Sequence, residues 1–318
     1  VMKFLQSILG CALLLAVMTP FTPTASAQPS ITSVPISASN GIYLVETVVP
    51  SPDIEFRMNN LLLVHPDGVI LVDTLIPGLY PLFAYEIHTL TAGEPVDTLI
   101  NTSWHFDHVG LNAEFRVLDG TSSIIAHTRA GDYMVELNCI EEIGMCMPPL
   151  PQEALPTEGI RGVVRFVSGN ETITLKTVEN AHSGADLVVY MEEANIVHTG
   201  DIYFGGMYSI IDLAGGGTVN GMLQGLNQIL ARIDADTIVV PSHGVVGSRQ
   251  SVLEFAEMLK NTRKLVRKLI AEGLTELEVM FHPSFAALDA EWGNGFIPGP
   301  VFRLIVYRDL SSHRGGKT

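Results

Sequence analysis

Hydrophobic and polar positions alternate or run together in short stretches along most of the chain, and this pattern divides it into strands and helices. Strand patterns cover residues 41–49, 59–64, 69–72, 98–101, 123–126, 163–178 as a hairpin, 187–191, 196–198 and 237–240. Helical patterns cover residues 80–91, 128–138, 218–233 and 250–271, while residues 29–40 have the composition of a polar lead-in. Hairpins dominate the early part and strands alternate with helices in the middle, which predicts two sheets with helices outside them, an α/β sandwich.

Residues 1–27 have the composition of an export signal. Lys3 precedes an apolar run over residues 8–18, and residues 25–27 read Ala-Ser-Ala, the small-residue pattern of a cleavage site. The apolar run is short for a membrane span, so we expect cleavage before Gln28 and no stable membrane anchor afterwards. The protein is then exported, either periplasmic or secreted. An uncleaved anchor is the alternative.

The remaining chain, residues 28–318, has the length and composition of a single domain with a helical C-terminal extension from about residue 250. Hydrophobic residues make up 47% of the 318 residues and charged residues 16%, which is typical of a globular protein. The formal net charge of −16 disfavours binding to nucleic acid or to anionic lipid. We therefore expect a small molecule as the partner, and the sequence leaves the oligomeric state open.

Two cysteines remain after the signal, Cys139 and Cys146, at the two ends of the segment CIEEIGMC. In an exported protein such a pair forms a disulfide across a short loop, or stays as two free thiols. The sequence leaves both open, and neither cysteine is near the candidate metal ligands along the chain.

Side chains of the types that commonly bind metal ions lie beside several of the expected strands. They are His105, Asp107 and His108 in the stretch NTSWHFDH, and Asp73, His182, Asp201 and His243 in the motifs VDT, NAHSG, HTGD and PSHG. Imidazole nitrogen and carboxylate oxygen bind zinc at distances of about 2.0–2.2 Å. Loops at strand ends are where a rigid scaffold usually carries its reactive groups, so these residues are the candidate site.

Other histidines and aromatic residues have simpler interpretations. His127 and His198 follow apolar strand residues, which is typical of buried histidines with a structural role. Trp104 is expected to pack beneath the metal-binding turn rather than to contact substrate. The aromatic residues of segment 203–208 are expected either in the core or in the lining of a pocket, and the sequence leaves both open.

The ordered motifs over residues 40–250 resemble those of the metallo-β-lactamase superfamily. That resemblance implies an αββα sandwich with two metal ions at the edge between its halves. It places the first ion at Ser103, His105 and His182, the second at Asp107, His108 and His243, and Asp201 as a bridge between them. Asp73 then lies outside the ligand set and orients the turn or a ligand histidine.

Ser103 departs from the family pattern, which reads H-x-H-x-D-H and has a histidine at this position. A neutral hydroxyl is a poorer zinc ligand than imidazole, so we expect one tightly bound zinc ion and a second that is weak or completed by substrate. Ser103 then holds a water molecule in place of a ligand, or orients the nucleophile. The alternative is a site that has lost catalysis while the fold is kept.

By the same resemblance, the expected activity is zinc-dependent hydrolysis, in which metal-bound hydroxide attacks a carbonyl carbon. The expected catalytic residues are Ser103, His105 and Asp107, with Asp107 passing a proton to the leaving group. The leading expectation for the substrate is the β-lactam ring of antibiotics. The sequence leaves open which residue anchors the substrate, and Arg57 is a candidate substitute for the Lys that binds the substrate carboxylate in some β-lactamases.

Two departures from the β-lactamases favour an ester, thioester or lactone hydrolase as the alternative. Asp201 stands where β-lactamases usually carry Cys or Ser, and no Lys follows it within several residues. A non-catalytic relative that binds a metal or another ligand is the second alternative, motivated by Ser103. The acidic surface disfavours a nuclease of the same superfamily.

Overall fold

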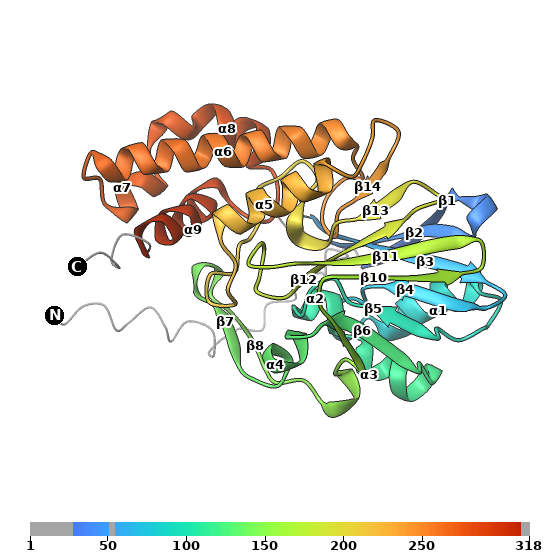
Figure 1. Ribbon diagram of the computed structural model, residues 1–318. Helices are drawn as coiled ribbons and strands as arrows, with labels where there is room; N and C mark the ends of the chain where they lie inside the picture. Colours follow the sequence, from blue (N-terminus) through green and yellow to red (C-terminus); the bar gives the residue numbers. More distant parts are fainter. Residues whose placement is uncertain (1–27, 51–54, 313–318) are drawn as a thin grey trace, which may run out of the picture.

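Two β-sheets form the centre of the molecule in the computed structural model, which describes residues 28–50 and 55–312 (Figure 1). In order across it, the first sheet contains β1 (Ser30–Ser37), β2 (Ile42–Pro50), β3 (Glu55–His65), β4 (Gly68–Val72), β5 (Thr98–Ile100), β6 (Ser123–His127) and β9 (Glu158–Ile160). The second contains β10 (Val163–Ser168), β11 (Glu171–Val178), β12 (Asp186–Met191), β13 (Ile196–His198) and β14 (Ile238–Val240). The predicted export signal over residues 1–27 lies outside the described residues.

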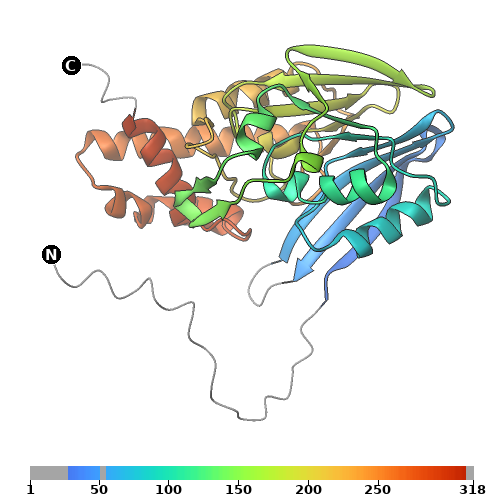
Figure 2. The same ribbon diagram turned by 90° about the horizontal axis from the view of Figure 1, so that it is seen from below.

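Helices lie outside the two sheets. They are α1 (Tyr80–Leu90), α2 (Phe106–Val109), α3 (Asn112–Glu114), α4 (Ala130–Met134), α5 (Val219–Leu230), α6 (Arg249–Ala271), α7 (Glu276–Met280), α8 (Ala286–Trp292) and α9 (Gly299–Ser312). Short 3₁₀ or π turns are η1 (Ala38–Asn40), η2 (Phe115–Asp119), η3 (Glu141–Ile143), η4 (Gln152–Ala154), η5 (Gly200–Ile202) and η6 (Pro283–Phe285). In Figure 2 the blue strands β1 to β4 of the first sheet lie apart from the yellow-green strands β10 to β12 of the second sheet. The α/β sandwich with outer helices predicted from the sequence is therefore confirmed.

Strand β3 shows why both faces of the first sheet are buried. Leu61 and Leu63 belong to the cluster between the sheets, together with Leu187 of β12. Leu62 points to the other face, because side chains alternate along a strand, and it belongs to the cluster that contains Phe83 of α1. Burial of each such side chain contributes about 1.5–3 kcal/mol, so the run of leucines holds three layers together.

The interpretation of residues 29–40 as a polar lead-in is wrong for most of this segment. Strand β1 pairs antiparallel with β2, with Ser30 opposite Val48 and Thr32 opposite Glu46. Its polar residues are compatible with a strand because β1 is at the edge of the sheet and much of it remains exposed.

The helix expected over residues 128–138 is shorter in the structure, where α4 ends at Met134. The chain then forms a hairpin of β7 (Asn138–Ile140) and β8 (Met145–Met147). Cys139 and Cys146 face each other across it and form a disulfide. Of the two states that the sequence left open, the structure has the disulfide.

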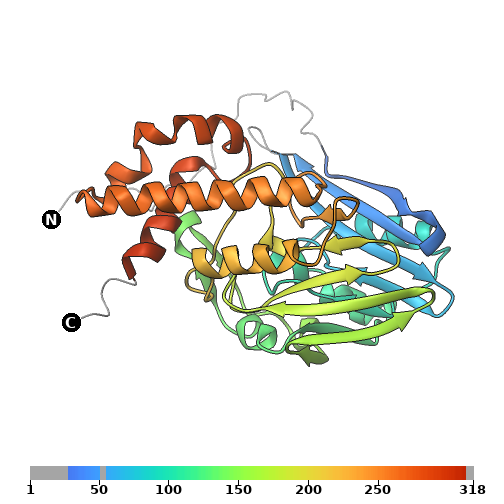
Figure 3. The same ribbon diagram turned by 45° about the horizontal axis from the view of Figure 1, so that its top comes forward.

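Helices α6 to α9 follow one another in the C-terminal part of the chain and gather at one end of the sheets (Figure 1 and Figure 3). Helices α5, α6 and α9 share one hydrophobic cluster, which includes Met222, Phe255 and Phe302. Arg303 of α9 pairs with Asp289 of α8 at 2.6 Å. Within the part of the chain that the structure describes, no helix combines the length and the apolar character needed to cross a bilayer.

Candidate metal centre

Two clusters of ligand-type side chains meet where strands of both sheets end. In each cluster the ligand atoms lie within 4.8 Å of one another: His105, His182 and Asp201 form the first cluster, and Asp107, His108 and His243 form the second. The loops after β5 and β14, the turn before β12 and η5 after β13 bring these residues together. The structure thus groups the six predicted ligands as the sequence motifs suggested.

Asp73 holds the turn that carries the second cluster. It follows β4 with φ of +62°, a left-handed conformation that Asp and Asn adopt more readily than most residues. Thr102 donates to both carboxylate oxygens, from its backbone N at 2.7 Å and its Oγ1 at 2.5 Å. His108 Nδ1 donates to the same carboxylate at 2.9 Å, so its Nε2 faces Asp201.

His182 and His243 are also oriented through one ring nitrogen each. His182 Nδ1 donates to the backbone O of Ile210 at 3.0 Å, and His243 Nδ1 donates to that of Arg57 at 3.0 Å. In each ring the Nε2 atom is left facing the clusters. Metal-ligating histidines typically have this arrangement, in which the second nitrogen donates to a carbonyl or carboxylate.

Asp212 orients the fourth histidine, although it was not among the sequence-predicted residues. Its Oδ2 accepts from His105 Nε2 at 2.9 Å, and its Oδ1 accepts from the backbone N of Gly215 at 2.7 Å. Position 215 requires glycine, because a Cβ there would lie 2.2 Å from Asp212 Oδ2. Burial by itself would raise the pKa of Asp212, but the hydrogen bond and charge of His105 outweigh burial and lower it. The only signal in the sequence was an acid just before a glycine run, IIDLAGGG.

Asp201 lies between the two clusters. Its Oδ2 is 3.2 Å from Nε2 of both His108 and His182. Its Oδ1 is 3.6 Å from His243 Nε2 and has no hydrogen-bond partner among the described residues. Burial alone would raise the pKa of Asp201, but the charges of His108, His243 and His182 hold it well below its usual range. A buried, ionised oxygen without a donor fits a cation at this place, so the donor set suits a metal ion.

Ser103 lies beside the first cluster and is only 1% exposed. Its Oγ is 3.1 Å from Nδ1 of His105, the ring nitrogen that lies 2.9 Å from His182 Nε2. The first cluster therefore combines two imidazoles with Asp201 and a hydroxyl close by. The second combines two imidazoles with Asp107 and the same Asp201, which is the stronger donor set for zinc.

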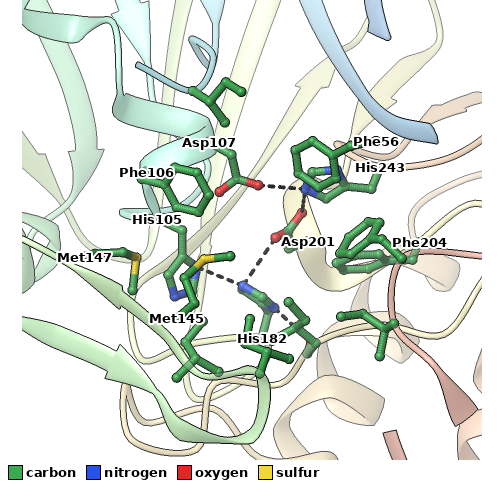
Figure 4. Close-up of a pocket in the computed structure, with 16 residues that line it drawn as sticks. Phe56, His105, Phe106, Asp107, Met145, Met147, His182, Asp201, Phe204 and His243 are labelled. Atoms are coloured by element: carbon green, nitrogen blue, oxygen red, sulfur yellow. Dashed lines mark hydrogen bonds and ion pairs between the residues drawn. The ribbon is translucent and has the colours of Figure 1, made fainter. Parts of the chain in front are cut away.

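Both clusters open into a cavity of about 380 Å³ whose other walls are apolar. Figure 4 shows the ligand side chains of Asp107, Asp201, His182 and His243 between two apolar sides, Phe56 and Phe204 on one and Phe106, Met145 and Met147 on the other. Among the described residues that line this cavity, none is Lys or Arg. Arg57 does not line it and pairs with Glu46 at 2.5 Å, so the structure does not support Arg57 as an anchor for a substrate carboxylate.

The two histidines with simpler interpretations lie as expected. His127 and His198 are buried, and His198 Nε2 donates to a backbone carbonyl of β3 at 3.1 Å. Trp104 stacks on Tyr133 with ring centroids 4.7 Å apart and does not line the cavity. In segment 203–208 the two tyrosines belong to the core, whereas Phe204 belongs to the core and also lines the cavity.

A family model described as the metallo-beta-lactamase superfamily matches residues 55–243, more than half of the chain. The chain belongs to the metallo-β-lactamase superfamily. This confirms the resemblance inferred from the ordered motifs, and all six candidate ligands as well as Asp73 lie within the matched range. Membership in this superfamily supports a metal-dependent hydrolase as the general class of activity.

Solved metallo-β-lactamases share the fold at low sequence identity. A metallo-beta-lactamase from Pontibacter korlensis matches with a TM-score of 0.58 and 16% identity, over 74% of this chain and 100% of its own. The metallo-beta-lactamase IND-7 matches with a TM-score of 0.57 and 18% identity, over 73% of this chain and 98% of its own. A metallo-beta-lactamase from Hirschia baltica matches with a TM-score of 0.56 and 18% identity, over 72% of this chain and 97% of its own. A comparison with curated protein sequences finds no match. The superfamily fold is thus shared, while these identities carry nothing about the substrate.

Two asparagines of β3 support the site of this superfamily member and were missed in the sequence. Asn59 Nδ2 donates to the backbone O of Pro241 and of Gly244, both at 2.9 Å, and so holds the loop that carries His243. Asn60 Nδ2 donates to the backbone O of Asp73 at 3.0 Å. Both are almost fully buried in a strand of leucines, and two adjacent polar residues in such a run were the signal that could have identified them.

Replacing Asp73 with Asn should weaken metal binding at the second cluster by about 10–100-fold, the usual effect of losing a partner of a ligand histidine. Asn keeps the size of the side chain and tolerates the positive φ, but it removes the charge that accepts from His108 Nδ1. Competition with a chromophoric zinc chelator measures the change. An affinity equal to that of wild type would contradict this role of Asp73.

Metal binding should release protons, mainly from the second cluster. Burial by itself would lower the pKa of His108 and His243, but nearby carboxylates outweigh burial and raise it: Asp201 and Asp73 for His108, and Asp201 and Asp107 for His243. Both rings therefore hold a proton more strongly than a free imidazole does. Burial lowers the pKa of His182 to about 4, so that ring is already neutral. Since metal ions bind neutral imidazole, affinity should fall as the pH falls. Calorimetric titrations with zinc in buffers of different ionisation enthalpy measure the release, and identical apparent enthalpies would contradict it.

Proposed function

We propose that this superfamily member is a zinc-dependent hydrolase of neutral, apolar esters, thioesters or lactones. The observation that carries the proposal is the cavity: it joins two clusters of metal ligands to apolar walls, with no Lys or Arg among the described residues that line it. A substrate with a carboxylate would lose its hydration there without a Lys or Arg partner, and its carboxylate would compete with the reacting carbonyl group for the metal ions. A neutral carbonyl compound has no such cost, and its apolar part gains from burial.

The donor set supports zinc as the metal, because histidine nitrogen and carboxylate oxygen are among its usual ligands. We propose that His105, His182 and Asp201 hold one ion and that Asp107, His108, His243 and Asp201 hold the other, with the first ion bound more weakly. A bound zinc ion supplies Lewis-acid chemistry and activates water at neutral pH.

Asp107 is the carboxylate of this set that can also serve as a proton carrier. It lines the cavity, and its Oδ2 lies 3.0 Å from His243 Nε2. Burial by itself would raise its pKa, but the charges and hydrogen bond of His108 and His243 lower it to about 2. Asp107 is therefore ionised at neutral pH, and we propose that it accepts a hydrogen bond from the attacking water and transfers the proton toward the leaving group.

Opening of a β-lactam ring is the second candidate. Solved proteins with this fold are titled metallo-beta-lactamases, and that chemistry needs the same attack on a carbonyl. Against it, β-lactam antibiotics usually carry a carboxylate, for which the cavity offers no cation among its described lining residues. Export, suggested by the composition of residues 1–27, is proposed for either activity.

The experiment is a substrate panel with the purified protein, first stripped of metal by a chelator and then reloaded with zinc. Neutral esters, thioesters and lactones should be hydrolysed only by the reloaded protein, and faster than penicillins, cephalosporins or carbapenems. Faster opening of the β-lactams would favour the second candidate. A zinc-loaded protein that hydrolyses none of these compounds would contradict the hydrolase proposal and favour a binding protein without turnover.

A further inference from the structure

A second apolar cavity adjoins the one at the metal centre. Its volume is about 290 Å³, and its walls come from the turn after β5, from α4 and from the β7–β8 hairpin. Three side chains line both cavities: Phe106, Met145 and Met147. The two spaces therefore share one wall.

The shared wall consists mostly of side chains that can change shape. Methionine is unbranched, has three rotatable bonds and fits irregular apolar contacts, so Met145 and Met147 can change rotamer to admit a chain and then pack against it. Figure 4 shows both methionines on the side of the metal centre opposite Phe204. The hairpin that carries them is held by the Cys139–Cys146 disulfide.

The far walls of the second cavity are suited to hydrocarbon. They include Trp104, which stacks on Tyr133, together with Met134 and Leu150. The amide of Asn138, a polar group at this cavity, is already used, because its Nδ2 donates to the backbone O of Tyr133 at 2.6 Å. Among the lining residues that the structure describes, the one acid is Glu136, which is exposed, and none is Lys or Arg.

The size of the two spaces matters for the substrate. Ligand cavities for small molecules usually measure about 300–1,000 Å³, and the cavity at the metal centre alone is near the lower end of that range. The two together reach its middle. The second cavity adds about 290 Å³, so a long chain can extend into it rather than into solvent.

We propose that the second cavity is a subsite for a long hydrocarbon chain of the substrate, which passes Met145 and Met147 while the carbonyl group stays at the metal clusters. This inference rests on the proposed hydrolysis of neutral carbonyl compounds. It assigns the substrate class more narrowly, to esters or thioesters with an extended aliphatic chain.

The kinetic test compares p-nitrophenyl esters of acetate and of decanoate in Leu150→Glu and Leu137→Glu. Leu150 is half-buried and lines only the second cavity, whereas Leu137 is 65% exposed and lines neither, so it is the matched control. A carboxylate in the subsite should lower kcat/KM for decanoate by about tenfold or more, while acetate hydrolysis stays within about twofold. Leu137→Glu should leave both unchanged. Equal losses for the two esters in Leu150→Glu, or no loss for decanoate, would overturn the subsite.

A binding test does not depend on turnover or on the folding of Leu150→Glu. The chain has two tryptophans, and in a Trp292→Phe variant the remaining one, Trp104, lines the second cavity. ω-Bromododecanol should quench its fluorescence saturably, since bromine quenches only at close range, and bromoethanol at the same concentration should not. Saturable quenching without any ester hydrolysis would leave the subsite in place while the proposed function fails. Absence of quenching in a protein that hydrolyses esters would overturn the subsite and leave the proposed function standing.

Discussion

Replacing Asp201 with Ala is expected to lower hydrolysis by about a thousandfold, near the upper end of what single groups contribute to a polar transition state. Among the described residues, Asp201 is the one ligand-type residue whose oxygens face both clusters: Oδ2 is 3.2 Å from His108 and His182, and Oδ1 is 3.6 Å from His243. Removing it takes a donor from both candidate metal positions at once. The variant would also lack the buried negative charge beside the four imidazole rings, which offsets the positive charge of bound metal ions.

Metal content measured by atomic absorption should fall in the same Asp201→Ala protein, after dialysis against a low concentration of zinc. The matched control is Asp236→Asn, which removes one exposed carboxylate that belongs to neither cluster. It should keep the metal content and the rate of wild type. If Asp201→Ala kept the metal content and the activity of wild type, Asp201 would not be part of the metal site.

Replacing Ser103 with His is expected to raise zinc affinity at the first cluster by about 10–100-fold, the scale on which single changes around a metal site act. The Ser103 hydroxyl lies 3.1 Å from His105 Nδ1, so a ring at this position is placed beside His182 and Asp201. Imidazole is the better zinc ligand. At limiting zinc, the metal content should rise from about one ion toward two.

The added ring has a cost, because Ser103 is buried and an imidazole is larger than a hydroxyl. Overpacking of this kind typically costs about 1–3 kcal/mol, which urea unfolding of the metal-free protein measures. Ser103→Ala is the control: it keeps the small size and removes only the hydroxyl, which is expected to hold water or to orient the nucleophile. Unchanged zinc affinity in a folded Ser103→His protein would show that position 103 does not face the first metal. A wild type that is inert while Ser103→His is active would show that the serine had abolished catalysis.

Much of the candidate site could be predicted from the sequence because each ligand belongs to a short motif at a strand end. His105, Asp107 and His108 lie on one turn, so their proximity is a property of local chain geometry. His182, Asp201 and His243 are far apart along the chain, but each lies where a strand begins or ends at the same edge. The order of the motifs was therefore enough to group them.

The parts that were missed depend on contacts between distant segments. Asp212 orients His105 across more than a hundred residues, and nothing in the local pattern around it indicates that partner. Strand β1 was missed because its polar residues are compatible with a strand only at an exposed sheet edge. That edge position arises from the pairing of β1 with β2 and cannot be read from the local pattern. The helix expected over residues 128–138 ended early because the chain turns there into the disulfide hairpin.

The sequence by itself determined the superfamily, the six candidate ligands and the departure at Ser103, since these are carried by residue types in short motifs. Only the tertiary structure decided what surrounds the ligands. Phe56, Met145 and Phe296 reach the cavity from three regions far apart in the chain, and Arg57 is held away from it by Glu46. The apolar character of the cavity is a property of packing between those segments, because burial assembles side chains that no local pattern connects. The proposed preference for a neutral substrate rests on that packing.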